Sequence, residues 1–242
     1  MSEQGPRYAI YYAPDADDPL WRFGCGYIGY DAETGADCSI PQIPALSHDD
    51  WIARTHEPRR YGFHATLKAP FHLAEGTSEA LLIESLRQFV SRREAVSLSG
   101  LDVRAIGNFA ALTPLEPNAE LVELARDCVT HFDVFRAPLG EGDMARRLAA
   151  PLTVRQKELL KTWGYPYVME EFRFHMTLTS SLSASELDVV VGELALRFRE
   201  QIGRHHLMIQ AVALFRQDTR DSRFRLHHRF PFTSGRISPE QT

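Results

Sequence analysis

The side chains best suited to chemistry in this 242-residue chain stand in two copies of one pattern, Phe-His-x-Thr-Leu. The copies lie at residues 63–67 and 174–178, so each supplies one histidine and one threonine. From the composition, a five-residue pattern of this kind is expected about 0.003 times in such a chain. Two copies therefore indicate a duplicated unit.

The spacing within each copy suits a β-strand, whose side chains alternate between two faces. In a strand, His64 and Thr66 point to one face, and Phe63, Ala65 and Leu67 point to the other. The second copy repeats this arrangement, with His175 and Thr177 on one face. Two such strands facing across a pseudo-twofold axis would place two imidazoles and two hydroxyls around one small volume.

These four groups suit the chemistry of a phosphodiester. One imidazole can act as a general base toward water or a hydroxyl, and the other can protonate the leaving oxygen near neutral pH. The hydroxyls of Thr66 and Thr177 can donate hydrogen bonds to the non-bridging oxygens. This scheme requires neither a metal ion nor a cofactor, so the sequence predicts none.

Cations near the two motifs could neutralise phosphate charge. Continued alternation places Lys68 on the face of His64, and Arg173 and Thr179 on the face of His175. We therefore include Lys68 and Arg173 among the expected substrate-binding residues. The alternative for each is a solvated residue at a strand end.

The elements that must position these residues occur in the same order in both halves of the chain. Each half contains a helix, a motif strand, a helix and two further strands. Residues 14–46 are expected to be rich in loops with a short strand near 23–30, and residues 136–152 to be irregular. Helices are expected at 47–55, 78–93, 118–132, 153–164 and 183–202, and strands at 7–13, 61–71, 95–104, 108–114, 172–182, 207–217 and 223–232.

This order predicts an α+β fold of two lobes, each a mixed or antiparallel sheet flanked by helices. We expect one bilobal domain over residues 1–234. The lobe with the first motif spans about 47–117, and the lobe with the second spans about 153–232. The polar residues 235–242 are expected to form a mobile tail.

Composition narrows the class of protein. Lys and Arg number 27 against 32 Asp and Glu, a net charge of −5, which argues against a broad basic surface for nucleic acid. Three cysteines without C-x-x-C spacing suggest neither a disulfide framework nor a zinc site and favour the cytoplasm. The apolar stretch at 8–13 is too short for a signal peptide or a membrane span, so no membrane partner is expected.

Other candidate residues remain ambiguous. The adjacent pairs His205–His206 and His227–His228 would face opposite sides of a strand, so neither chelates one metal simply. Arginines near the first motif and in the C-terminal hairpin could bind a second anionic group or form a solvated face, and two tyrosines before the second motif could line a cleft or simply pack. These are Arg59, Arg60, Arg216, Arg220, Arg223, Arg225, Arg229, Tyr165 and Tyr167.

The paired H-x-T strands of a duplicated chain resemble the 2H phosphoesterase superfamily, which includes RNA 2′,3′-cyclic-phosphate enzymes. The longer phrases RRYGFHATLKAPF (59–71) and FRFHMTL (172–178) resemble the subgroup found with phosphonate-utilisation operons. The resemblance implies a bilobal fold around a central cleft and metal-independent chemistry. It also implies that His64 and His175 form the acid–base pair and that Thr66 and Thr177 bind phosphate. Some RNA-directed members carry a basic residue shortly after the second motif, where this chain has Thr179.

Together these observations predict a phosphoesterase that opens a small cyclic phosphodiester, such as a sugar cyclic phosphate of phosphonate metabolism. The expected partner is a small phosphorylated substrate. One alternative is an RNA 2′,3′-cyclic phosphodiesterase or end-joining enzyme. The other is a non-catalytic protein that binds a phosphate ligand. The sequence contains no G-x-x-x-x-G-K pattern, no G-x-G-x-x-G that follows an expected strand and no G-x-S-x-G, so neither a nucleotide-dependent enzyme nor a serine hydrolase is indicated.

Overall fold

The computed structural model describes residues 5–44, 46–203 and 206–233. Its helices are α1 (Pro19–Ile28), α2 (His48–Arg54), α3 (His56–Tyr61), α4 (Glu79–Val90), α5 (Ala119–His131), η1 (Asp133–Phe135), α6 (Glu141–Leu148), α7 (Val154–Trp163), η2 (Met169–Glu171) and α8 (Ala184–Gln201). Its strands are β1 (Arg7–Tyr12), β2 (Ala65–His72), β3 (Val96–Leu98), β4 (Leu101–Ile106), β5 (Phe109–Pro114), β6 (Met176–Thr177), β7 (Leu207–Ile209), β8 (Ala211–Gln217) and β9 (Arg225–Pro231).

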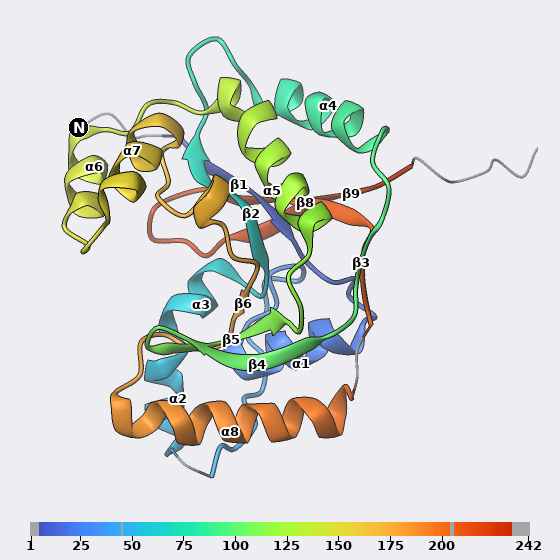
Figure 1. Ribbon diagram of the computed structural model, residues 1–242, viewed down its shortest axis with the longest axis vertical. Helices are drawn as coiled ribbons and strands as arrows, with labels where there is room; N and C mark the ends of the chain where they lie inside the picture. The colour runs from blue at the N-terminus through green and yellow to red at the C-terminus, as the bar shows by residue number, and fades with distance from the viewer. Residues whose placement is uncertain (1–4, 45, 204–205, 234–242) are drawn as a thin grey trace, which may run out of the picture.

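Seven of these strands form one sheet in the order β4-β5-β6-β2-β1-β8-β9, and β3 pairs with β7 in a second, two-stranded sheet. Every recorded strand pair is antiparallel. The motif strands β2 and β6 are neighbours near the middle of the larger sheet (Figure 1). The predicted α+β class with antiparallel sheets is confirmed.

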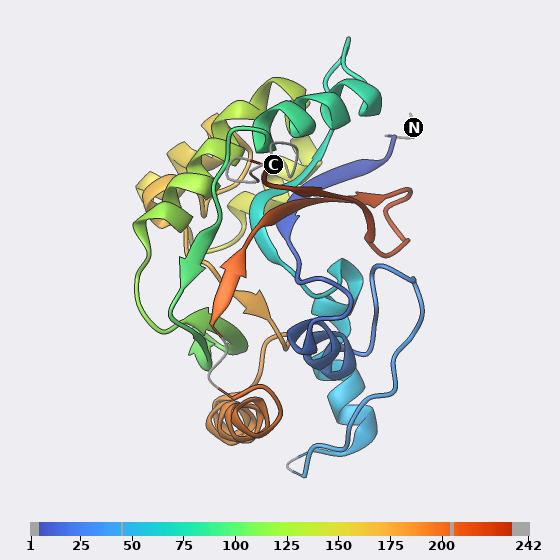
Figure 2. The ribbon, with the colours of Figure 1, turned by 90° about the vertical axis from the view of Figure 1, so that its right-hand side faces the viewer.

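The duplication is visible in the order of the elements. The series β2-α4-β3-β4-β5 corresponds to β6-α8-β7-β8-β9. The hairpin that follows each motif strand lies on the side of the other motif strand. Hairpin β4–β5 pairs with β6, and hairpin β8–β9 is joined to β2 through β1. Helix α8 lies against β4 and helix α4 against β9, so each of these helices packs on the hairpin from the other half of the chain (Figures 1 and 2).

Most helix starts follow the capping residues seen in the sequence. The side chains of Ser47, Ser78 and Thr153 accept hydrogen bonds from the first turn of α2, α4 and α7. A capping box at Ser183 opens α8. Gly164, in the left-handed conformation, ends α7 as predicted.

Three expectations about elements are wrong. Residues 19–28 form α1 instead of a short strand, because the Asp18 side chain accepts from the Leu20 amide and Pro19 is the first helical residue. The segment 136–152, expected to be irregular, contains the short polar helix α6. Within 172–182, only Met176–Thr177 pair as a strand.

The apolar side of both motifs lies in the core. Phe63, Ala65 and Leu67 are buried, as are Phe174, Met176 and Leu178. Helix α1 covers the first motif so closely that a Cβ on Gly24 would lie 2.2 Å from the Phe63 ring. The predicted alternation of the motif side chains is therefore present.

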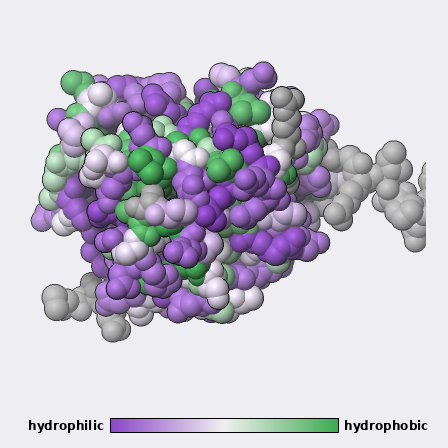
Figure 3. Space-filling model, turned by 90° about the horizontal axis from the view of Figure 1, so that it is seen from below, coloured by the Kyte–Doolittle hydropathy of each residue, from purple (hydrophilic) through white to green (hydrophobic). Residues whose placement is uncertain are grey.

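The face seen from below in Figure 3 is mostly hydrophilic, with hydrophobic residues in small areas. Scattered apolar residues of this kind are normal on a protein surface. Within the described ranges, no helix is both long and apolar enough to cross a membrane. The predicted tail at 235–242 lies outside the described residues, and the predicted domain limits stay a prediction.

Candidate active site

The pairing of β2 with β6 brings the four motif side chains together. Ala65 is the recorded partner of Met176. In an antiparallel ladder, that register sets His64 opposite Thr177 and Thr66 opposite His175. Directly opposite residues share a face, and diagonal neighbours lie about 7–8 Å apart with their Cβ atoms somewhat closer. The two imidazoles thus occupy diagonal corners of a square whose other corners are hydroxyls.

All four side chains line one cleft of about 840 Å³. This volume lies within the range typical of small-molecule sites. The cleft is also lined by aromatic, cationic and hydroxyl side chains from several elements, among them Arg7, Tyr11, Arg60, Phe109, Arg146, Arg147, Tyr165, Ser180 and Arg220.

A main-chain carbonyl fixes the tautomer of His64. Its Nδ1 lies 2.8 Å from the Gly62 carbonyl oxygen, which can only accept, so Nδ1 carries the proton. Gly62 has a φ of +79°, and a Cβ there would lie 2.6 Å from that of Ala32, so this position requires glycine. The Nε2 atom is left as the proton acceptor.

His175 is held in the same way. Its Nδ1 donates to the carbonyl of Arg173 at 2.7 Å, again two residues earlier. Both histidines therefore keep Nε2 available for proton transfer. The repetition of this local contact supports a common role for the two motifs.

The surroundings favour the neutral form of both imidazoles. Burial lowers the pKa of His64 to about 4, with His175 nearby adding to the shift and the bond to Gly62 opposing it. The Tyr11 ring stacks on His64 with centroids 3.7 Å apart. Burial also lowers the pKa of His175, opposed by its bond to Arg173. His64 can accept a proton over a wide range of pH.

The threonines provide the hydroxyls of the square. Thr66 Oγ1 lies 3.2 Å from His64 Nε2, and with the proton on Nδ1 this hydroxyl is the donor. Thr177 lines the same cleft. Thr179 lines it too, but its hydroxyl accepts from the Ala110 amide at 2.9 Å and serves the fold.

The placement of Lys68 on the face of His64 is wrong. Thr66 pairs with Tyr11, whereas Lys68 pairs with Ile10, because the register shifts between these two pairs. Ile10 and Tyr11 point to opposite faces, so Lys68 leaves the face of His64. Its buried ammonium donates to the Val129 carbonyl at 3.0 Å and to Asp133 at 3.1 Å.

Arg173 is also not brought to the cleft. Its side chain is exposed and does not line the cavity that holds both histidines. What Arg173 supplies to the site is its carbonyl, which orients His175. A position just before the central strand pair leaves the side chain free to point into solvent.

Arginines that the sequence did not single out line the cleft instead. Arg7 comes from β1, and Arg146 and Arg147 come from α6. Arg60 and Arg220, which were ambiguous, line it as well, as does Tyr165. The basic last turn of α6 was the available signal, but the segment around it was expected to be irregular.

The remaining ambiguous residues mostly serve the fold. In the C-terminal hairpin, Arg223 pairs with Asp37, and Arg229 pairs with Glu33. His227 contacts Glu79 at 3.1 Å. His205 lies outside the described residues. Among the described ones, no group of three or more His, Cys, Asp or Glu is placed to hold a metal ion.

Known proteins resemble this chain over most of its length. The profile of the family described as "Protein of unknown function (DUF1045)" matches residues 66–225. The chain is 38% identical over 235 residues to "Ribose 1,5-bisphosphate phosphokinase PhnN" of Janthinobacterium sp. (strain Marseille), covering 96% of this chain and 52% of that protein. It is 34% identical over 220 residues to the protein of the same name in Laribacter hongkongensis (strain HLHK9), covering 91% and 50%.

The chain therefore spans about half the length of the curated relatives it matches. Among solved structures, E. coli LigT complexed with 3′-AMP is similar over 95% of this chain and 99% of that chain, with 14% identity and a TM-score of 0.42. The adjacent motif strands, with both H-x-T pairs in one cleft, agree with the predicted resemblance to 2H phosphoesterases.

Proposed function

The chain belongs to the DUF1045 family, and on that premise we propose that it is a phosphoesterase that opens a small cyclic phosphodiester without a metal ion. The observation that carries the proposal is the square of two imidazoles and two hydroxyls lining one cleft. A phosphodiester centred there would have a histidine Nε2 on each side. Thr177 would donate a hydrogen bond to a non-bridging oxygen, and Thr66 would do the same once its hydroxyl turns from His64 Nε2 to the substrate.

The reaction needs one proton acceptor and one donor. One neutral imidazole removes a proton from water as the water oxygen attacks phosphorus. The other, protonated, donates to the ring oxygen as its bond to phosphorus breaks, which leaves a phosphomonoester and a free hydroxyl. We assign the base to His64, whose pKa is lowered to about 4. We assign the acid to His175, which the substrate's negative charge would help to protonate.

A ribose cyclic phosphate is the substrate that the relatives favour. The name of these longer relatives refers to a phosphorylated ribose, ribose 1,5-bisphosphate. This chain, in contrast, contains no G-x-x-x-x-G-K pattern for binding ATP. We therefore propose that this chain hydrolyses the cyclic phosphodiester of a ribose and does not phosphorylate a ribose. The resemblance to the phosphonate-operon subgroup supports the same substrate. The free thiols of Cys25, Cys38 and Cys128 suit a cytoplasmic setting.

Phosphorus NMR with a panel of cyclic phosphodiesters tests the proposal. The panel contains ribose cyclic phosphates, nucleoside 2′,3′-cyclic phosphates and a short RNA ending in a cyclic phosphate, all with EDTA. We expect the wild type to open the ribose compounds. His64→Ala and His175→Ala should each lower turnover by roughly two to four powers of ten. His48→Ala, an exposed histidine on α2, is the matched control.

Each other outcome has a distinct meaning. Wild-type turnover in both histidine variants would overturn the acid–base roles, and loss of activity in EDTA would overturn the metal-free scheme. Turnover confined to the RNA would favour the RNA enzyme. Binding of the panel without turnover would favour a phosphate-binding protein.

A further inference from the structure

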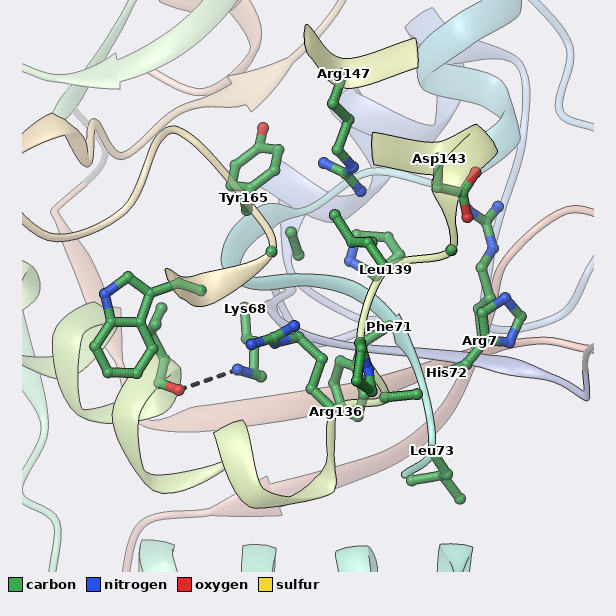
Figure 4. A pocket seen from close by; sticks show the side chains of 18 of the residues that line it. Arg7, Lys68, Phe71, His72, Leu73, Arg136, Leu139, Asp143, Arg147 and Tyr165 are labelled. Atoms are coloured by element: carbon green, nitrogen blue, oxygen red, sulfur yellow. Dashed lines mark hydrogen bonds between the residues drawn. The ribbon is translucent and has the colours of Figure 1, made fainter. Parts of the chain in front are cut away.

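A second cavity of about 240 Å³ adjoins the catalytic cleft between β2 and α6. The two share lining residues, including Arg7, Arg147 and Tyr165. Figure 4 shows Arg147 and Tyr165 on one side of this cavity and Lys68 and Arg136 on the other. The cavity is smaller than the 300–1,000 Å³ typical of sites that hold a whole ligand. It has room for one group of a substrate whose remainder lies in the cleft.

The lining of this side cavity carries more positive than negative charge. Its cations are Arg7, Lys68, Arg136, Arg146 and Arg147, and its carboxylate is Asp143. Several of the cations are already neutralised. Lys68 and Arg136 both contact Asp133, and Arg146 lies 2.8 Å from Asp143.

Two arginines have no such neutralisation. Among the described residues, Arg7 and Arg147 form no ion pair with a carboxylate. Asp143, whose charge acts on Arg147, is already engaged by Arg146 and by Arg220 at 2.6 Å. Burial lowers the pKa of both the Arg7 and the Arg147 guanidinium. Two partly buried cations at one cavity therefore lack an anion.

The hydrogen bonds of Arg7 and Arg147 also indicate that an anionic ligand could bind here. Arg7 donates to Gln217, a neutral acceptor. The Nε of Arg147 is buried and has no hydrogen-bond partner among the described residues, and its guanidinium lies 5.4 Å from the centre of the Tyr165 ring. Both ring nitrogens of His72, which also lines the cavity, are buried and have no hydrogen-bond partner in the described part of the chain. Buried donors without acceptors destabilise a protein unless a ligand satisfies them.

We propose that this side cavity binds a second phosphate of the substrate, a phosphomonoester held by Arg7 and Arg147. The inference rests on the proposed function, because it places the cyclic phosphodiester of the same molecule between His64 and His175. Arginine suits the role, since its planar guanidinium can bind two phosphate oxygens at once. The substrate class is then a sugar that carries a cyclic phosphodiester on one part of the ring and a phosphomonoester on a separate carbon.

A matched pair of substrates tests the second phosphate. We compare kcat/KM for ribose 1,2-cyclic phosphate with and without a phosphate on C5. The wild type should prefer the phosphorylated compound by roughly 10- to 100-fold, as expected for charge-assisted hydrogen bonds. Arg147→Gln should remove that preference, and Arg147→Lys should restore part of it. Arg126→Gln, an exposed arginine of α5 paired with Glu123, should keep it.

A binding measurement separates this inference from the catalytic proposal. We titrate ribose 5-phosphate into wild type, His64→Ala and Arg147→Gln by calorimetry. His64→Ala should bind as the wild type does, and Arg147→Gln should bind roughly 10-fold or more weakly. Equal kcat/KM for the two substrates, or equal affinity in Arg147→Gln, overturns the second phosphate site. If neither ring is opened while Arg147→Gln still weakens binding, the catalytic proposal fails and the phosphate site stands.

Discussion

At the scale of single residues, the orientation of both histidines is a local property of the chain. Each Nδ1–H donates to the carbonyl two residues earlier, that of Gly62 or Arg173, so no distant side chain is needed to set the tautomer. Carbonyl oxygens accept at every pH, which makes this orientation independent of titration. The reactive Nε2 atoms can therefore face the cleft in the empty protein.

The lowered histidine pKa values predict an unusual pH profile. The base His64 must be neutral, so kcat/KM should fall as the pH drops through about 4. The acid His175 must be protonated, so kcat/KM should also fall as the pH rises through its pKa, which burial lowers from 6.5. We expect a bell-shaped curve with its maximum between these limits, since kcat/KM reports the free enzyme. The measurement is kcat/KM from pH 3.5 to 8 at constant ionic strength.

Variants show which histidine produces each limb of the curve of kcat/KM against pH. His175→Ala should lose the alkaline limb at its lower rate, and His48→Ala should keep the wild-type curve. A kcat/KM that keeps rising to pH 8 would contradict the assignment of His175 as the acid.

The sequence predicts the motif residues better than the arginines around them. His64 and Thr66 share a face because of strand alternation alone, and the second motif obeys the same rule. Arg7 and Arg147 reach the cleft through tertiary packing of β1 and α6, which no local pattern encodes. Their nearness to the histidines could be recognised only once the chain was folded.

At the scale of elements, the irregular register of β2 directs Lys68 away from the cleft and into contacts that stabilise the fold. The shift between Thr66 and Lys68 turns Lys68 toward α5 and η1. Asp133 then accepts from Lys68 and from Arg136, at 2.8 Å to Arg136 Nε. Through its contact with Lys68, the Asp133 carboxylate links η1 to the motif strand β2.

Asp133→Asn should therefore lower the free energy of unfolding. The change removes the charge that two partly buried cations share, and we expect a loss of about 1.5–3 kcal/mol. Burial alone would raise the pKa of Asp133, but Arg136 and Lys68 outweigh it and lower the pKa. The carboxylate therefore stabilises the fold above its unfolded pKa near 3.8, and this stability is lost as the pH falls through the lower folded pKa.

Urea unfolding of wild type and Asp133→Asn at pH 7 and pH 3 measures the effect. The difference between the two proteins should be smaller at pH 3. Glu123→Gln on α5, which breaks an exposed ion pair with Arg126, should change the free energy by less than about 0.5 kcal/mol. An Asp133→Asn protein as stable as the wild type at pH 7 would show that the contact contributes nothing.

Capping residues explain which elements could be predicted. Ser47, Ser78, Thr153 and Ser183 each precede an amphipathic run, so their helices were expected. Asp18 and Pro19 carry an equally good start signal, but the many Gly, Pro and Asp residues of 14–46 indicated loops. Helix α6 spans only Glu141–Leu148, is mostly polar and buries no residue, so the short segment did not stand out as a helix.

At the scale of the whole molecule, the two halves are interwoven. The repeat of elements was visible in the sequence, because the motif and the helix starts recur in order. The exchange of hairpins was not, since strand order depends on contacts between residues far apart in the chain. The short pair β3–β7 joins equivalent strands of the two halves and fits the same pseudo-twofold relation.

This exchange predicts that neither half folds alone. A fragment of residues 5–150 would leave β5 without β6 and β1 without β8, which exposes unpaired strand edges and apolar faces. We expect each separate half to lack a cooperative unfolding transition and the mixed halves to recover one. In the full chain, urea unfolding followed by tryptophan fluorescence and by circular dichroism should give coincident midpoints. Trp21 and Trp163 belong to different halves, so single-tryptophan variants report on each. Two separated midpoints, or a stable fragment with a cooperative transition, would show that the lobes follow the sequence halves after all.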